Sequence, residues 1–338
     1  MAERVLEVSK LTAGFPTDHG FLKATDNVSL TIDRGETLCL VGESGSGKSV
    51  TSLAIMRLLE YEGGLIIDGT IKLHDEDLTA KTQEEMTRIR GKKIAMIFQD
   101  PMSALNPVFT VGEQIAESLR LHQNMSSKEA EKEAIELLRR VGIPAPEIRF
   151  RQYPHELSGG MCQRVVIAIA LACKPDLLIA DEPTTALDVT VQAQILELLK
   201  NLQAEFGLSI LLITHDMGVA AEMADRIAVM YAGTIVEQGN VKDIFANPSH
   251  PYTRGLLQSI PGFEGERGSE LYTIKGSIPP LTQLPSGCRF HPRCPHADSH
   301  CMREQPGYFA VSGKDHSAAC WLYDPARAAE EEAGVSRE

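Results

Sequence analysis

The residues with the clearest chemistry form the stretch GESGSGKS, Gly42 to Ser49. Its pattern, a glycine, four residues, a second glycine, a lysine and a serine, is typical of a loop that binds phosphate. Glycines let successive backbone N–H groups curl around a phosphate, Lys48 reaches the outer phosphates, and Ser49 can ligate Mg²⁺. The structural alternative is a plain glycine turn. We expect a nucleoside-triphosphate site, and the residues expected to bind the nucleotide are Gly42, Glu43, Ser44, Gly45, Ser46, Gly47, Lys48, Ser49 and Val50.

A pair of acidic residues ends the apolar stretch LLIADEP, Leu177 to Pro183. An apolar strand would deliver Asp181 to a position where its carboxylate can hold a magnesium shell. Glu182 then sits where an attacking water needs a general base. The alternative is that the two carboxylates only cap a strand end. Beside a phosphate loop, the pair predicts hydrolysis of the bound nucleotide.

A third stretch, LSGGMCQR from Leu157 to Arg164, places two glycines after a serine at the start of a helix. This makes a second anion-binding helix N-terminus, with Ser158 as its cap. One nucleotide does not need two such sites from one chain. Here the sequence resembles the ATP-binding cassette family, over essentially its whole length. The resemblance implies that two ATPase domains face head to tail, with Ser158, Gly159 and Gly160 of one touching the ATP of the other. Met161 departs from the glutamine of many members but leaves those donors in place.

The resemblance assigns roles to further residues. Gln99, in FQDPMSALNP, resembles the glutamine that senses Mg²⁺ and the membrane subunits. Asp188, in ALD, resembles the D-loop aspartate, and His215, in ITHD, the switch histidine near the γ-phosphate. Adenine is expected to stack on Phe15, with Phe21 as the alternative, although either ring could only pack a strand edge. Taken alone, a glutamine, aspartate or histidine is more often structural than catalytic.

With these roles the expected catalytic residues are Glu182, His215 and Gln99, and the expected magnesium ligands are Ser49, Gln99 and Asp181.

The elements that must position these residues alternate between short apolar runs and segments of helical period, which predicts an α/β domain with a central sheet. The expected buried strands are Thr37–Val41, Lys93–Phe98, Asp176–Asp181 and Ser209–Thr214. The resemblance implies a RecA-like P-loop ATPase core with a mainly parallel central sheet, an N-terminal antiparallel β part and an inserted helical subdomain. The expected divisions are an ATPase domain at 1–247, its helical subdomain at about 100–162, a loop-rich C-terminal transporter region that binds a metal at 248–325, and an acidic tail at 326–338.

Two segments carry a clear helical stripe. In the segment from Ser126 to Gly142, Ser126 and Glu129 suit a capping box, Gly142 suits the helix end, and the expected buried stripe is Ala134, Leu137, Leu138 and Val141. In the segment from Gln192 to Gly207 the expected stripe is Ile195, Leu198, Leu199 and Leu202.

Composition narrows the class of protein. The formal net charge of −13 over 338 residues argues against a nucleic-acid binder, whose affinity rests on cationic contacts to phosphate. The longest apolar run, Val165 to Cys173, has nine residues where a membrane-spanning helix needs about 20. Only about 58 residues separate Gln99 from Leu157, which leaves no room for the long coiled coil of the chromosome-maintenance relatives. The transporter reading is therefore favoured over a soluble cassette ATPase that acts on DNA or ribosomes.

The stretches FQDPMSALNP and SHPYTRGLLQSIPG and the cysteine-rich tail resemble the dipeptide and oligopeptide importer ATPases, most closely the dipeptide type, in a group with nickel and opine relatives. The resemblance implies a peripheral protein at the cytoplasmic face of the bacterial inner membrane. It also implies two integral-membrane permease subunits, a second cassette ATPase with a heterodimer favoured over a homodimer, and a periplasmic or lipid-anchored substrate-binding protein. No nucleic-acid partner is expected, and the chain does not reveal the transported solute.

The tail contains Cys288, Cys294, Cys301 and Cys320, with five, six and eighteen residues between successive cysteines. Four thiolates can hold zinc or an iron–sulfur cluster, and the alternative is unligated thiols. The resemblance favours a four-iron four-sulfur cluster, with zinc second. The interleaved histidines, expected to lie around the ligands or to face solvent, are His291, His296, His300 and His316. The remaining cysteines, expected in the core, are Cys39, Cys162 and Cys173.

Overall fold

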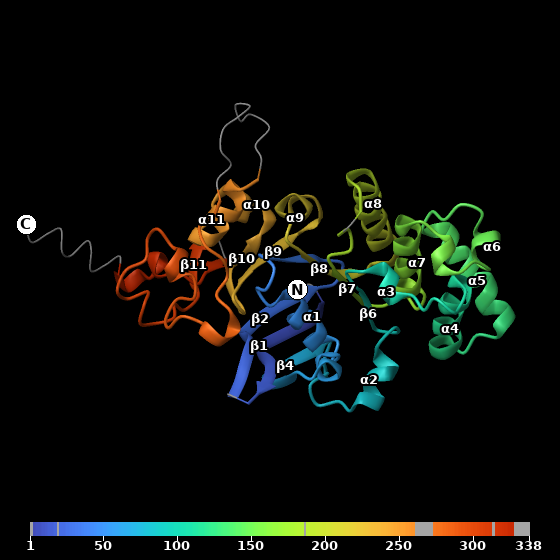
Figure 1. Ribbon diagram of the computed structural model, residues 1–338, viewed down its shortest axis with the longest axis horizontal. Coiled ribbons are helices and arrows are strands. Elements are labelled where there is room, and N and C mark those ends of the chain that lie inside the picture. The colour runs from blue at the N-terminus through green and yellow to red at the C-terminus, as the bar shows by residue number, and fades with distance from the viewer. Residues whose placement is uncertain (1–2, 19, 186, 261–272, 313–314, 328–338) are drawn as a thin grey trace, which may run out of the picture.

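The central sheet of the computed structural model gathers strands from most of the chain (Figure 1). The structure describes residues 3–18, 20–185, 187–260, 273–312 and 315–327. Within them the sheet has the order β11-β12-β10-β9-β3-β8-β7-β6. Neighbouring parallel strands are β9 (Arg226–Tyr231), β3 (Thr37–Val41), β8 (Ser209–Thr214), β7 (Leu177–Asp181) and β6 (Ile94–Ile97). The antiparallel edge contains β10 (Thr234–Asn240), β12 (His316–Ala318) and β11 (Phe309–Ser312). The four predicted strands lie side by side, which confirms the α/β class.

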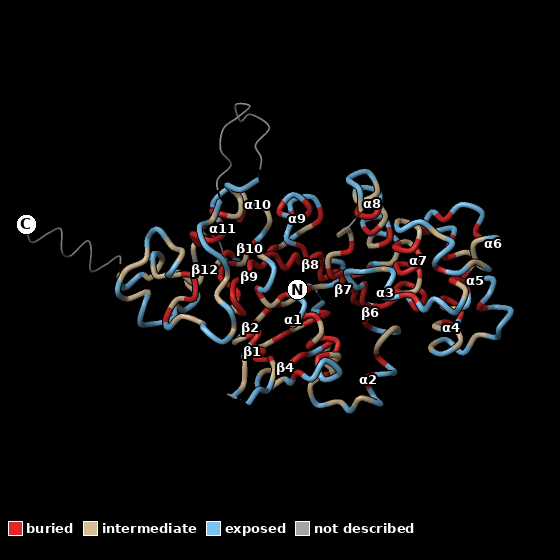
Figure 2. The backbone as a smooth tube through the Cα atoms, in the orientation of Figure 1, coloured by how far each residue is buried: buried red, intermediate tan, exposed pale blue. Residues whose placement is uncertain are grey.

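The middle strands are apolar throughout because both faces of the sheet are covered. In β3, Leu38 and Leu40 face a core shared with the N-terminal sheet, whereas Cys39 and Val41 face a core shared with helices. This alternation turns β3 into one continuous apolar run that is buried at every position. Figure 2 shows the buried residues following the sheet while the outer helices turn an exposed face to solvent.

A smaller antiparallel sheet covers one face of the central sheet, in the order β2-β1-β4-β5. Its strands are β1 (Arg4–Thr17), β2 (Gly20–Asp33), β4 (Leu65–Leu73) and β5 (Glu76–Asp77). Helix α1 (Lys48–Ile55) contacts β1, β2 and β4 of this sheet and β7 of the central sheet. The short helix α2 (Gln83–Ile89) follows β5. The first residue of α1, Lys48, is thus fixed between two sheets.

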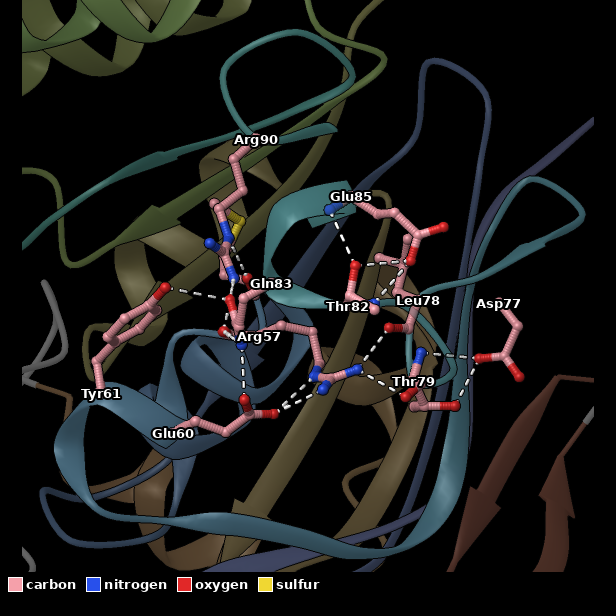
Figure 3. A network of polar contacts seen from close by, with 11 residues as sticks. Arg57, Glu60, Tyr61, Asp77, Leu78, Thr79, Thr82, Gln83, Glu85 and Arg90 are labelled. Carbon is pink, nitrogen blue, oxygen red and sulfur yellow. Dashed lines mark hydrogen bonds and ion pairs between the residues drawn. The ribbon is translucent and has the colours of Figure 1, made fainter. Parts of the chain in front are cut away.

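The far end of α1 is held by the polar network of Figure 3. Arg57, which has a φ of 53°, pairs with Glu60 at 2.6 Å and donates to the carbonyl oxygen of Leu78 at 2.6 Å. Arg90 donates to the carbonyl oxygen of Arg57 and to Oε1 of Gln83, both at 2.6 Å. Since these partners lie just after α1, just after β5, and in or just after α2, the network ties the segment that follows α1 to the small sheet.

Helices on the other side of the sheet form the lobe seen at the right of Figure 1. They are α3 (Pro101–Ala104), α4 (Val111–Gln123), α5 (Ser127–Arg140), α6 (Pro146–Arg149) and α7 (Gly159–Leu171). The capping box of Ser126 and Glu129 is confirmed, and the predicted stripe of α5 is buried in full. Gly142 follows α5 with a φ of 75°, which glycine adopts without strain. Helix α7 continues from this lobe toward the central sheet, where it contacts β6.

The remaining helices are α8 (Val189–Phe206), α9 (Met217–Met223), α10 (Val241–Ala246) and α11 (Pro251–Gln258). In α8 the predicted stripe is confirmed except at Leu198, which is half-buried while Leu196 takes the buried position. The region after residue 247 is rich in loops, as expected, but its strands β11 and β12 also extend the central sheet. The predicted acidic tail lies, from residue 328 onward, outside the described residues.

One histidine of the tail is placed differently from the prediction. His316 Nε2 lies 2.8 Å from Oε1 of Glu237, and both side chains are fully buried. His316 therefore belongs to the contact between β12 and β10, and its expected position around a metal or in solvent is wrong. Because Glu237 also accepts the backbone N–H groups of Ser249 and His250, one buried carboxylate joins three parts of the C-terminal region.

Candidate functional site

The phosphate loop runs from the end of β3 to the first turn of α1. Gly47 has a φ of 104°, and a Cβ there would lie 2.6 Å from the carbonyl oxygen of Ala24. Gly45 has a φ of 81°. Both residues have a positive φ that favours glycine, and at Gly47 the neighbouring backbone also leaves no room for a side chain. The loop can therefore turn its backbone N–H groups inward, which is the arrangement a phosphate requires.

Lys48 lies at the base of this loop with its Nζ donating to the carbonyl oxygens of Gly42 and Glu43, at 2.7 and 3.0 Å. Burial lowers the pKa of Lys48, and the negative charges of Glu182, Asp181 and Glu43 oppose that shift. An ammonium group held among carbonyls and carboxylates is suited to a phosphate, whose charge would further favour the protonated form.

Asp181 ends β7 beside the first turn of α1. Its Oδ1 is buried without a hydrogen-bond partner, although the carboxylate receives hydrogen bonds from Ser49 and Ser52. Burial raises the pKa of Asp181, the nearby charge of Glu182 raises it further, and these serines and Lys48 oppose the shift. A buried carboxylate oxygen that lacks a partner costs free energy unless a cation or water satisfies it. The pair of Ser49 and Asp181 consequently fits the oxygen ligands that Mg²⁺ prefers.

Glu182 is the point where the predicted catalytic residues meet. Gln99 Nε2 donates to its Oε2 at 3.1 Å, and Thr185 Oγ1 donates to the same oxygen at 3.0 Å. His215 Nδ1 lies 3.2 Å from Oε1. Glu182 itself has a φ of 47°, an uncommon conformation for a residue with a side chain. A neighbouring threonine and two residues distant in the sequence, Gln99 and His215, thus orient one carboxylate, as a general base requires.

These residues line one open cleft of about 640 Å³. Phe15, from β1, forms part of its wall, so the ring predicted to stack on adenine faces the same cleft as the phosphate loop. Phe21 is not among the residues that line it. The lining residues are Phe15, Ala24, Glu43, Ser44, Gly45, Gly47, Lys48, Ser49, Val50, Gln99, Glu182, Thr185, His215 and Leu281.

The serine and glycines predicted to touch a second nucleotide do not line this cleft. Ser158 caps α7 by accepting the N–H of Met161 at 3.4 Å, and Gly159 is exposed with open space around it. Gly160 lies against Val191 of α8, whose N-terminus is capped by the exposed Asp188. The structure therefore separates the predicted residues into a cleft and an exposed edge formed by the N-termini of α7 and α8.

Sequence reasoning missed several neighbours of the site, and Ala24 of the cleft lining is one of them. Thr185 orients Glu182, Leu281 lines the cleft from the C-terminal region, and Tyr252 accepts the backbone N–H of Glu43 at 2.8 Å. The threonine directly follows the acidic pair and so could have been suspected. Leu281 and Tyr252 lie in loop-rich sequence where no periodic pattern points to the cleft.

The predicted metal site in the tail is wrong. The four C-terminal cysteines line one small cavity, but among the described residues no group of three or more His, Cys, Asp or Glu side chains is arranged to hold a metal ion. All four are free cysteines, and burial raises the pKa of each thiol, to about 11 for Cys288 and Cys320. The missing ligand arrangement, within the part of the chain that the structure describes, removes the support for a bound metal. Both the four-iron four-sulfur cluster and zinc are therefore withdrawn, and the three core cysteines are buried as predicted.

Within the residues that the structure describes, no helix has the length and apolar character needed to cross a membrane.

Comparisons with known proteins show the family to which the chain belongs. The family described as "ABC transporter" matches residues 25–185, and the family described as "Oligopeptide/dipeptide transporter, C-terminal region" matches residues 236–301. Two relatives come from Bacillus subtilis (strain 168). The oligopeptide transport ATP-binding protein AppD is 55% identical over 321 residues, 95% of this chain and 97% of that protein. The dipeptide transport ATP-binding protein DppD is 52% identical over 322 residues, 95% of this chain and 96% of that protein.

Among solved structures, a dimeric post-hydrolysis state of the ATP-binding cassette MJ0796 bound to ADP and Pi has a TM-score of 0.63 and 32% sequence identity, and the match covers 70% of this chain and 98% of that one. The phosphate loop, the acidic pair and the helix that begins at Gly159 are thus parts of a shared cassette fold. The chain belongs to the ATP-binding cassette family, in the group of oligopeptide and dipeptide transporter ATP-binding proteins.

Proposed function

We propose that this chain is the ATP-hydrolysing subunit that drives peptide import through a multi-subunit transporter. The observation that carries the proposal is the carboxylate of Glu182, held by Gln99, Thr185 and His215 at the cleft that contains the phosphate loop. In this reading Lys48 binds the outer phosphates and Glu182 takes a proton from the attacking water. His215 and Gln99 orient that carboxylate, and Phe15 stacks on adenine.

Mg²⁺ is proposed to bind at Ser49 and Asp181, with Gln99 as a further ligand. The buried, unpartnered Oδ1 of Asp181 supports this assignment. When bound, the ion neutralises charge on the phosphate oxygens. The protein's own contribution is to hold Ser49 at the helix start and Asp181 at the strand end, where neither needs to reorganise.

A second cassette ATPase is proposed to complete each nucleotide site, and we favour a heterodimer over a homodimer. Ser158, Gly159 and Gly160, with Asp188 beside them, would contact the nucleotide of the partner. Ser158, Gly159 and Asp188 are exposed, and none of the four residues lines this chain's own cleft, which supports that role. The similar cassette MJ0796, described as dimeric, adds support.

The transport role follows from the relatives. AppD and DppD are named as oligopeptide and dipeptide transport ATP-binding proteins, and the described residues contain no membrane-crossing helix. We therefore propose two integral-membrane permease subunits, a periplasmic or lipid-anchored substrate-binding protein and a place at the cytoplasmic face of the bacterial inner membrane. The division into an ATPase domain to residue 247, with its helical subdomain, and a C-terminal region from residue 248 belongs to the same proposal.

Co-purification from detergent-solubilised membranes tests this assignment. The tagged chain should be recovered with two polytopic membrane proteins and a second cassette ATPase, and its ATP hydrolysis should rise when a peptide-loaded binding protein is added. A soluble cassette ATPase acting on DNA or ribosomes is not favoured by the relatives, and recovery with nucleic acid instead of membrane proteins would reverse the ranking.

A further inference from the structure

Glu43, the second residue of the phosphate loop, is a junction between the loop and the C-terminal region. Its backbone N–H donates to the hydroxyl of Tyr252 in α11, at 2.8 Å. Its carbonyl oxygen accepts from Lys48 Nζ, at 3.0 Å. Its carboxylate pairs with both terminal nitrogens of Arg293, at 2.9 and 3.1 Å. Two of its three polar groups are thus held by residues more than 200 positions away in the sequence.

Arg293 is itself fixed in place. Its side chain is 7% exposed, and its guanidinium carbon lies 5.7 Å from the centre of the Tyr231 ring and 5.9 Å from that of Phe290. Nε donates to the carbonyl oxygen of Lys275 at 2.9 Å, and Nη2 also donates to that of Gly276 at 3.2 Å. A planar guanidinium with this many partners has one orientation, so the fork it presents to Glu43 is rigid.

A second arginine of the same segment holds the backbone beside a residue that contacts the other end of the loop. Arg289, also nearly buried, donates to the carboxylate of Asp26 and to the carbonyl oxygen of Ala232. Gly233, which follows Ala232 in the chain, donates its N–H to the carbonyl oxygen of Ser46 at 2.8 Å. The segment from 289 to 293 thus contacts the phosphate loop directly through Arg293 and indirectly, through Ala232 and Gly233, at Ser46. Phe290 of this segment packs against Tyr231 and Tyr252, and the ring centres of the three residues lie 4.8 to 5.5 Å apart.

We propose that Arg293 and Tyr252 are positioning residues through which the C-terminal region holds the phosphate loop in its ATP-binding conformation. Neither needs to touch the nucleotide. Arg293 fixes the side chain of Glu43, Tyr252 fixes its backbone, and Glu43 presents the carbonyl oxygen that orients Lys48. The affinity of this chain for ATP is therefore set in part from outside the ATPase domain. This inference rests on the proposed function, since it names what positions that same site.

The test is the dissociation constant for ATP with Mg²⁺, measured by calorimetry on the purified full chain. Arg293→Ala is expected to raise it about 5- to 50-fold, within the range of coupling between sites in proteins. Arg293→Lys keeps the charge but loses the two-pronged geometry, so it is expected to raise the constant about 3- to 10-fold. Tyr252→Phe changes no charge and removes only the hydroxyl that accepts from Glu43, and we expect a similar loss. Arg303→Ala, an exposed arginine of the same region, is the matched control and should bind ATP like the wild type.

Hydrogen–deuterium exchange gives a second readout, because the amides of residues 43–48 should exchange faster in Arg293→Lys and Tyr252→Phe than in the control. Should Arg293→Ala weaken binding while Arg293→Lys and Tyr252→Phe bind like the wild type, the effect is one of net charge and the proposal is overturned. The proposal is also overturned if Arg293→Ala, Arg293→Lys and Tyr252→Phe lower the melting temperature but leave the dissociation constant for ATP unchanged. A wild-type chain that fails to bind ATP would instead count against the proposed function, so the two failures are distinguishable.

Discussion

Acid should weaken this protein through one buried histidine. His250 is buried within the C-terminal region as the N-cap of α11, where its Nδ1 accepts the backbone N–H of Tyr252 at 3.1 Å. Burial lowers the pKa of His250 to about 3, and the charge of Arg254 adds to the shift. A proton on Nδ1 would have to displace the N–H that already donates there. The folded protein therefore keeps this ring neutral at pH values where an unfolded chain protonates it.

The magnitude follows from the linkage between protons and folding. The unfolded histidine has a pKa of about 6.5, so between that value and about 3 the unfolded chain binds more protons and stability falls as pH falls. From pH 7.5 to pH 5.5 the loss from this group is about 1.4 kcal/mol, or tenfold in the ratio of folded to unfolded protein. The result does not depend on the folded pKa as long as that pKa stays below about 4.5.

Urea unfolding at the two pH values measures the loss, and His250→Asn is the matched variant. Asparagine can still accept from the backbone at the helix start but does not titrate. The variant should lose about 1.4 kcal/mol less than the wild type over the same interval, because the other histidines are common to both. An equal loss in both proteins would show that the buried ring is not the source.

Three further changes test other parts of the structure. Gly47→Ala places a Cβ 2.6 Å from the carbonyl oxygen of Ala24, so calorimetry should show ATP affinity reduced by about tenfold or more, and by less in Gly45→Ala, where a Cβ meets nothing within 4 Å. Arg90→Ala leaves part-buried acceptors of the network in Figure 3 without their donor and should lower the free energy of unfolding by about 2 kcal/mol in urea, while Arg88→Ala, at an exposed position, should change it by less than about 0.5 kcal/mol. Because the pKa of Cys288 is raised to about 11, its alkylation by iodoacetamide at pH 8 should be about a hundredfold slower in the folded protein than in urea; equal rates would contradict the burial of that thiol.

The parts of the fold and the site that sequence could predict are local. A phosphate loop, its strand and its helix are contiguous in the chain, so the spacing of the residues from Gly42 to Ser49 is enough to predict the loop. The strand β3 is an apolar run because both of its faces are covered, and the cap of α5 is a three-residue signal. Glu182 is predicted from the acidic pair that ends an apolar run, whereas Gln99 and His215 are predicted only through resemblance to a family, and the structure places both of those side chains against Glu182.

What sequence could not predict depends on contacts between distant segments. The pairing of Glu43 with Arg293 joins residues 250 positions apart, and no periodic pattern marks either partner. The metal site predicted at the four C-terminal cysteines is wrong for a related reason. The sequence gives the number and spacing of the thiols but not their burial or their mutual geometry. His316 looked like a companion of those cysteines, yet β12 pairs with β10 and buries it against Glu237.

The assignment of Glu182 as the general base is tested most directly by measuring ATP hydrolysis in the assembled transporter with Glu182→Gln in this chain. Glutamine keeps the shape that Gln99, Thr185 and His215 surround but cannot take the proton from water. ATP should still bind at this chain's site, while hydrolysis at that site should fall by about 10²- to 10⁴-fold, as for removal of a general base. A variant that hydrolyses ATP at the wild-type rate in the same assembly would contradict the assignment of Glu182 and, with it, the proposed chemistry of the cleft.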